Sequence, residues 1–124
     1  MYNRGIRGAT TVTRNEEQDI LQATAELLKD IVNRNEIVPE DIASVWITVT
    51  PDLDATFPAR AIRGLSGWDM VPLMCSTEIP VKGGLPKCIR LLLHVNTTKG
   101  QREMKHVYLN EAKSLRPDLS TSNS

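Results

Sequence analysis

The stretch Cys88-Ile89-Arg90-Leu91-Leu92-Leu93-His94-Val95 is the longest apolar run in the chain. Its odd-numbered positions are all large and apolar, which predicts a β-strand with one fully apolar face. Leu92 adds apolar surface to the opposite face, so such a strand needs cover on both sides. Helices of the same chain can cover one side. We therefore expect contact between the sheets of different subunits to cover the other.

The segments around this strand predict the rest of the fold. Apolar residues recur every three or four positions from Ile20 to Ile31, which indicates a long amphipathic helix that ends near Asn33. Asn15 stands where a helix N-cap would. We expect helices over 16–33 and 58–65, shorter helical turns at 39–41 and 101–105, and strands over 3–13, 44–50, 71–79, 87–97 and 106–109.

This order of elements predicts an α+β fold, a mixed sheet with helices on one face. The length of 124 residues suits one domain, which we place at 1–117. The remaining residues, 118–124, are polar and small, and we expect them to form a mobile tail.

Composition limits the possible partners. Fifteen Lys and Arg balance fifteen Asp and Glu, so the chain lacks the basic excess of nucleic-acid-binding proteins. No apolar run reaches the ~20 residues of a membrane span, and the first residues do not resemble a signal peptide. We expect a cytoplasmic protein without membrane or nucleic-acid contacts. Cys75 and Cys88 are then free thiols, and the spacing of the Cys and His residues predicts no metal site.

Two arginines interrupt apolar segments: Arg90 in the central strand and Arg7 between Ile6 and Gly8. A guanidinium in such a place needs an anionic partner. Each arginine could pair with a structural carboxylate such as Glu78, or both could converge on an anionic ligand. Tyr108 would contribute its hydroxyl if it faced the same cleft.

Several common catalytic motifs are missing. No Ser sits in a nucleophile elbow, and Lys82-Gly83-Gly84 lacks the spacing of a phosphate-binding loop. Gly5-Ile6-Arg7-Gly8 is not a dinucleotide fingerprint, because the next helix begins too late to meet a pyrophosphate. The residues by themselves therefore indicate either a binding protein or an enzyme for a small carboxylate.

Several motifs in order along the chain resemble one family. They are Arg4-Gly5-Ile6-Arg7-Gly8-Ala9-Thr10-Thr11-Val12, Thr50-Pro51-Asp52-Leu53, Phe57-Pro58-Ala59, Leu65-Ser66-Gly67-Trp68, Lys87-Cys88-Ile89-Arg90, His106-Val107-Tyr108-Leu109 and Leu115-Arg116-Pro117-Asp118-Leu119. Together they resemble the monofunctional AroH-class chorismate mutases of the trimeric Bacillus type. The resemblance covers nearly the whole chain.

The resemblance implies a homotrimer with a pseudo-barrel of sheets inside, helices outside, and three active sites at subunit interfaces. It implies the Claisen rearrangement of chorismate to prephenate, on the branch to phenylalanine and tyrosine, with no metal or organic cofactor. Chorismate is a dicarboxylate, which suits the arginines.

The resemblance also implies residue roles. Arg90 matches the cation that contacts the ether oxygen and a carboxylate. Arg7 and Tyr108 match the groups that hold the side-chain carboxylate, and Glu78 and Cys75 match those that meet the ring hydroxyl and the positive side of the transition state. Because Glu78 and Arg90 would meet across an interface, chains lacking one should complement chains lacking the other.

Further matches outline the pocket. The apolar wall corresponds to Phe57, Ala59, Leu73 and Leu115. Arg63 and Arg116 match charges at the mouth, where they would attract a dianion. Arg60 stands where the family often has Lys, and Met74 replaces a smaller polar residue, so the entrance and pocket shape should differ in detail.

Two alternatives share this kind of trimer. One is a non-catalytic trimer that binds a small metabolite in its interfacial clefts. The other is an imine or enamine hydrolase, which would need a water-activating arrangement. The joint presence of Arg7, Glu78, Arg90 and Tyr108 favours the mutase.

Overall fold

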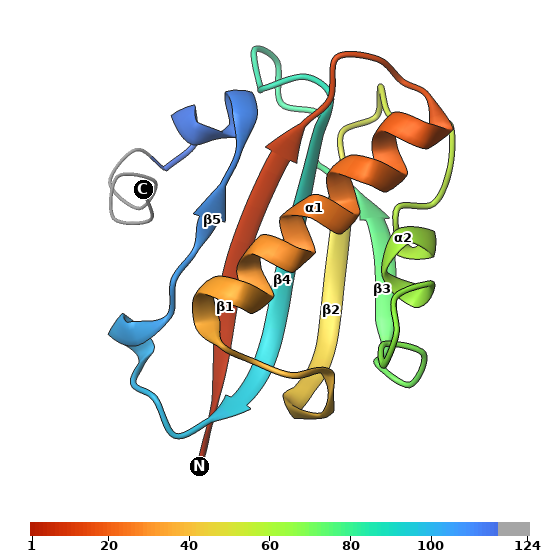
Figure 1. Cartoon of the computed structure of the whole chain (residues 1–124). Helices are drawn as coiled ribbons and strands as arrows, with labels where there is room; N and C mark the ends of the chain where they lie inside the picture. Colours follow the sequence, from red (N-terminus) through yellow and green to blue (C-terminus); the bar gives the residue numbers. More distant parts are fainter. Residues whose placement is uncertain (117–124) are drawn as a thin grey trace.

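A single mixed sheet carries both helices on one face (Figure 1). The computed structural model describes residues 1–116, so the end of the expected domain at 117 and the expected tail at 118–124 lie outside the described residues. Its elements are β1 (Tyr2–Thr11), α1 (Glu17–Asn35), η1 (Pro39–Asp41), β2 (Ile42–Val49), α2 (Ala59–Arg63), β3 (Leu73–Thr77), β4 (Cys88–Thr97), η2 (Gln101–Glu103), β5 (Val107–Tyr108) and η3 (Asn110–Ser114).

The apolar strand β4 is the centre of the sheet. The strand order is β3-β2-β4-β1-β5, and β4 is antiparallel to both of its neighbours. The outer pairs, β2 with β3 and β1 with β5, are parallel. The α+β class and the mixed sheet are therefore confirmed.

The core lies between the sheet and α1, which crosses β1, β4 and β2 in Figure 1. The predicted helical stripe is buried, and Ile20, Leu27 and Ile31 have no exposed surface. They pack against the odd-numbered face of β4, including Leu91 and Leu93. Packing of this apolar stripe, more than helix propensity, stabilises a helix of this length.

The start of α1 differs from the prediction at Asn15. Glu16 occupies the N-cap position and makes no side-chain cap bond. Asn15 instead donates to the Asp54 carboxylate at 2.7 Å and accepts the backbone N–H groups of Asp54 and Ala55, each at 3.1 Å. The Asn15 side chain hydrogen-bonds the loop before α2 because that loop offers two backbone N–H donors and a carboxylate acceptor. α2 itself is shorter than predicted, with Pro58 as its N-cap and Gly64 as its C-cap.

The sheet face opposite the helices is apolar and open. Trp46, Met74 and Leu92 lie on it, with 45%, 56% and 38% of their surfaces exposed. This agrees with the expectation that the second face of β4 needs cover. Over residues 1–116, no helix is both long and apolar enough to cross a membrane.

Candidate active site

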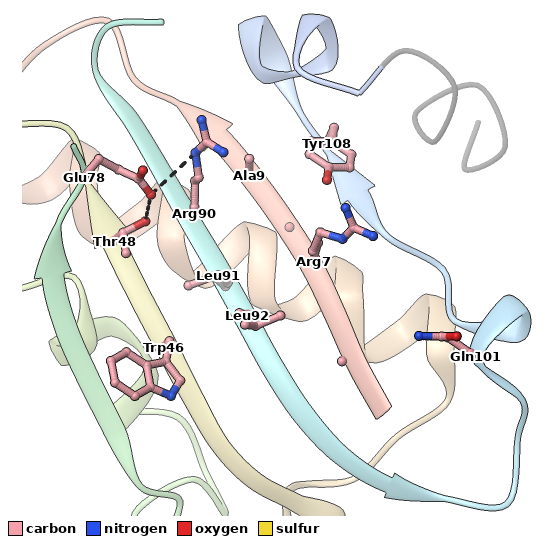
Figure 2. A pocket seen from close by; sticks show the side chains of 12 residues that line it. Arg7, Ala9, Trp46, Thr48, Glu78, Arg90, Leu91, Leu92, Gln101 and Tyr108 are labelled. Atoms are coloured by element: carbon pink, nitrogen blue, oxygen red, sulfur yellow. Dashed lines mark hydrogen bonds and ion pairs between the residues drawn. The ribbon is translucent and has the colours of Figure 1, made fainter. Parts of the chain in front are cut away.

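The main hollow of the molecule lies on the open sheet face, on the side away from α1 (Figure 2). It has a volume of about 630 Å³. Strands β1, β2, β4 and β5 all contribute to it. Its lining includes four residues predicted for the site: Arg7, Glu78, Arg90 and Tyr108.

The strand register explains why these side chains meet. Successive side chains of a strand alternate between faces, so the even positions of β4 share a face with the odd positions of β1. Arg90 stands opposite Ala9 on β1 and opposite Thr48 on β2. Arg7 lies two residues before Ala9 and therefore points to the same open face. The pairing of β1 with β4 brings the two arginines into one hollow.

Arg90 has a carboxylate partner but keeps much of its guanidinium accessible. Its Nε lies 3.6 Å from Glu78 Oε2, and the Thr48 hydroxyl donates to that same oxygen. The Arg90 side chain is 47% exposed. An ion pair of this length that uses only Nε leaves the terminal guanidinium nitrogens available for a ligand.

Arg7 is less neutralised than Arg90. Within the part of the chain that the structure describes, no carboxylate forms an ion pair with its guanidinium. The interpretation that each arginine has a structural carboxylate partner is therefore wrong for Arg7. For Arg90 the expected partner Glu78 is present, yet the pair is open to the hollow (Figure 2).

Two arginines act on the His106 ring, which lies two residues before Tyr108. Burial lowers the pKa of His106 below its ordinary value of 6.5, and the charges of Arg7 and Arg116 lower it further. Cys88 shows the opposite case, because burial raises the pKa of its thiol above 9.0 and keeps it neutral. Cys88 is 1% exposed and packs against Ala9 and Tyr108, so its role is in packing.

Other predicted site residues line a separate hollow. Phe57, Arg60 and Cys75 surround a space of about 530 Å³ between the start of α1, α2 and β3. Arg60 donates from Nη1 to Glu17 and Thr56, each at 2.8 Å, and Phe57 is 70% exposed. Cys75 faces this side because it shares the helix-covered sheet face with Leu73. One chain therefore does not bring Cys75 and Glu78 into a common pocket.

The remaining predicted residues lie around these two hollows. Ala59 is buried in the core, Leu73 is half-buried against it, and Met74 is exposed on the open sheet face. Arg63 is exposed on α2. Leu115 packs against the small cluster of Ala9, Cys88, Tyr108 and Ala112, and Arg116 is half-buried beyond it.

The expectation that Glu78 and Arg90 meet across a subunit interface, on which the predicted complementation rests, differs from what the structure shows. The two side chains form their ion pair within a single chain, because Glu78 directly follows β3 and its N–H bonds the Val49 carbonyl at 2.8 Å. This bond places Glu78 beside Thr48, next to β4. A variant of either residue therefore disrupts the same ion pair.

The sequence interpretation missed some of the residues that line the main hollow. Thr48 and Trp46 lie on its wall, as do Leu92 and Gln101 (Figure 2). Thr48 had a signal, since it alternates along β2 with the apolar residues Ile47 and Val49, which face the core, and so had to face the open side. Gln101 had none, because a 3-10 turn between strands can be placed only by the tertiary fold.

The arrangement suits a small anionic ligand. Two guanidiniums, a carboxylate and the apolar surface of Trp46 and Leu92 share one concave surface. Such a surface can hold a carboxylate on the arginines and a hydrocarbon ring on the apolar wall. Within residues 1–116, no group of three His, Cys, Asp or Glu side chains could hold a metal ion.

Comparison with known proteins gives a consistent result. Residues 3–119 match the family described as chorismate mutase type I. The chain is 52% identical over 120 residues to chorismate mutase AroH of Bacillus subtilis, covering 97% of this chain and 94% of that protein. It is 48% identical over 120 residues to chorismate mutase AroH of Thermus thermophilus, covering 96% and 98%. A solved chorismate mutase from Clostridium thermocellum superposes with a TM-score of 0.86 at 51% identity, covering 89% of this chain and 97% of that one.

Proposed function

Because the chain belongs to the type I chorismate mutase family, we propose that it converts chorismate to prephenate in the biosynthesis of phenylalanine and tyrosine. The observation that carries this function is the main hollow, where Arg7 and Arg90 face one apolar-walled space with Glu78 beside them. Chorismate carries two carboxylates on a small ring, and this hollow offers the matching charges and surface.

Arg90 acts on the breaking bond. Negative charge develops on the ether oxygen as its C–O bond lengthens, and a fixed guanidinium stabilises this charge more in the transition state than in the substrate. The Glu78 pair holds Arg90 by Nε, and Thr48 holds Glu78 in turn. The donor is thus oriented before the substrate arrives.

Arg7 and Tyr108 control the conformation of the substrate. A guanidinium without a carboxylate partner binds the side-chain carboxylate, and the neighbouring phenol adds a second donor. Holding this group keeps the side chain folded over the ring, so the two carbon atoms that must join stay close together. Glu78 faces the ring and stabilises the positive side of the transition state.

The reaction needs no added cofactor. The rearrangement breaks one C–O bond and forms one C–C bond within a single molecule, with no net proton transfer or oxidation. The described residues can supply the positioning and the charges it requires. We place this activity in one domain, residues 1–117, of a cytoplasmic protein that does not engage membranes or nucleic acid.

A second chain completes the site. The main hollow extends across the open face from β2 to the edge strand β5, whereas Phe57, Arg60 and Cys75 surround the hollow beside β3, the opposite edge strand. A head-to-tail ring can bring one edge of each subunit to the other edge of the next, which a closed trimer achieves with three equivalent contacts. The exposed Trp46, Met74 and Leu92 would then be covered.

Within such a trimer, each site combines residues from two chains. One chain supplies Arg7, Glu78, Arg90, Tyr108 and the adjoining Leu115 and Arg116. Its neighbour supplies Phe57, Arg60 and Cys75 from the second hollow, together with four further residues of α2 and β3: Ala59, Arg63, Leu73 and Met74.

The deciding experiment follows chorismate with purified protein in the presence of a metal chelator. Disappearance of chorismate with formation of an equal amount of prephenate is the expected result. Tight chorismate binding without any prephenate would instead support the non-catalytic trimer. Hydrolysis of an imine or enamine without action on chorismate would support the third alternative.

A further inference from the structure

The two-residue strand β5 carries Tyr108 but pairs with β1 over a very short length. Its register sets Gly8 opposite Val107 and Ala9 opposite Tyr108, and Leu109 N–H donates to the Ala9 carbonyl at 2.9 Å. If this parallel ladder continued, the next bond would run from the Arg7 N–H to the Lys105 carbonyl. Hydrogen bonds from the side chains of Asn35 and His106 take the place of that backbone bond.

Asn35, the last residue of α1, takes the Lys105 peptide away from β1. Its side-chain Nδ2 donates to the Lys105 carbonyl at 2.9 Å, and its Oδ1 accepts the Lys105 N–H at 2.8 Å. Asn35 is only 2% exposed, and both bonds are partly buried. The Lys105 carbonyl is therefore engaged by α1 and does not meet the Arg7 amide.

His106 supplies the acceptor that the ladder lacks. The Arg7 N–H donates to its Nδ1 at 2.9 Å. An imidazole nitrogen accepts a hydrogen bond only when it carries no proton, so the ring is neutral and its proton resides on Nε2. Because Asn35 fixes the preceding peptide, the ring is held at the edge of β1.

We propose that His106 is a positioning residue, whose Nδ1 holds the backbone of Arg7 against the segment that carries Tyr108 and so sets the spacing of the two groups in the main hollow. This hydrogen bond is the His106 latch. The proposal rests on the proposed function for its effect on chorismate, and on the Arg7–His106 contact alone for its structural part.

The charges around the ring keep the latch closed at neutral pH. Arg7 of β1 and Arg116 beyond η3 both act to lower the pKa of His106, as does burial. Lys105, its neighbour in the chain, is exposed, and α1 presents the neutral Asn35. Protonation would turn the acceptor into a donor beside two cations. Acid well below the ordinary His value of 6.5 should therefore open the latch.

Two variants separate the hydrogen bond from the bulk of the ring. His106→Asn places an amide oxygen near the position of Nδ1 and does not titrate, whereas His106→Leu fills similar space without an acceptor. We expect His106→Leu to raise KM for chorismate about tenfold with a smaller change in kcat, because Arg7 and Tyr108 hold a carboxylate in both substrate and transition state. His106→Asn should restore KM to within about threefold of the original protein. A threefold change corresponds to less free energy than one typical hydrogen bond contributes.

A readout that does not depend on activity is the NMR signal of the Arg7 amide during an acid titration of the unmodified protein. That signal should move together with the titration of the His106 ring, and the His94→Asn variant identifies which ring is which, since the chain has only two histidines. In His106→Asn the Arg7 signal should no longer respond to the pH, and in His106→Leu its exchange with solvent should accelerate.

Three outcomes decide the proposal. It is overturned if the Arg7 amide ignores the His106 titration, or if the Asn and Leu variants show the same KM. If the protein does not act on chorismate but the Arg7 amide responds as described, the proposed function fails and the latch stands.

Discussion

Arg90 shows how one residue can be held in place without losing its capacity to bind. Its ion pair with Glu78 uses Nε at 3.6 Å, and about half of the side chain stays exposed. A shorter, bidentate pair would be stronger but would occupy the donors that a substrate needs. The loose pair therefore orients the guanidinium without a bidentate carboxylate contact, as the proposed interaction with the ether oxygen requires.

Replacing Arg90 by citrulline through semisynthesis tests whether its charge acts on the transition state. Citrulline keeps the planar shape and most donors but is neutral, so kcat should fall about 10²–10³-fold, or roughly 3–4 kcal/mol, with a smaller rise in KM. Steady-state kinetics measure both constants, and circular dichroism checks the fold. Near-normal kcat with a raised KM would make Arg90 a simple carboxylate clamp.

Cys75 is half-buried whereas Cys88 is buried, and the proposed reaction does not use Cys75 as a nucleophile. Cys75→Ser should keep kcat within about tenfold, because a hydroxyl can replace a thiol as a hydrogen-bonding group, whereas a covalent mechanism would lose nearly all activity. Mass spectrometry during turnover provides the complementary test. A chorismate-derived adduct on Cys75 would contradict the proposed mechanism.

At the scale of elements, the contact between β1 and α1 depends on Gly8. A Cβ at this position would lie 2.5 Å from Ile31 Cδ1 and 3.2 Å from Leu27 Cδ1, both on α1. The missing side chain allows the helix to approach the strand directly behind Arg7 and Ala9. The packing on one face of β1 thus sets the position of the residues that line the main hollow on the other.

Gly8→Ala should destabilise the protein by about 1–3 kcal/mol, because the added methyl overpacks a fully buried contact. Gly5→Ala is the matched control, since its Cβ would meet the nearest atom, Leu92 Cδ1, at an ordinary 3.6 Å. Denaturant unfolding at one fixed protein concentration compares the two variants. Equal stabilities would mean that Ile31 and Leu27 repack at no cost.

At the scale of the whole molecule, the two hollows lie in different places on the sheet. The main hollow lies on the open face, and the second hollow lies beside α1, α2 and β3. In the proposed trimer, one half of each site consists of Arg7, Glu78, Arg90 and Tyr108, and the hollow beside β3 forms the other half. A single chain cannot bring these halves together, because Cys75 and Glu78 face opposite sides of the sheet. Assembly of several chains is therefore required for the proposed mechanism.

Mixing two inactive variants tests this shared site. The Arg90→Ala and Phe57→Asp variants each damage a different half of the site. Mixed trimers should therefore regain part of the activity, because some of their sites combine two intact halves. Arg90→Ala mixed with Glu78→Ala is the matched control and should stay inactive, because these residues belong to the same half. Sedimentation should show a trimer, and a fully active monomer would overturn the assignment.

Local patterns in the sequence were enough to predict most elements and the identity of the key arginines. Three- and four-residue spacing from Ile20 to Ile31 predicts α1, and alternation predicts β2 and β4, because burial on one side imposes a period on the side chains. Arg90 stood out because a charge inside an apolar strand is costly without a partner. The family resemblance added the chemistry, which no periodic pattern contains.

Only the tertiary structure decided which of these residues meet. The register between β1, β4 and β2 puts Arg7, Arg90 and Glu78 into one hollow. The alternation of side chains along β3 points Cys75 to the other face of the sheet. Asn15 bonds a distant loop in place of its own helix, and His106 bonds the amide of Arg7, 99 residues away in the chain. Such contacts join segments far apart in the sequence, so they depend on strand pairing and helix packing, and local residue patterns carry no information about them.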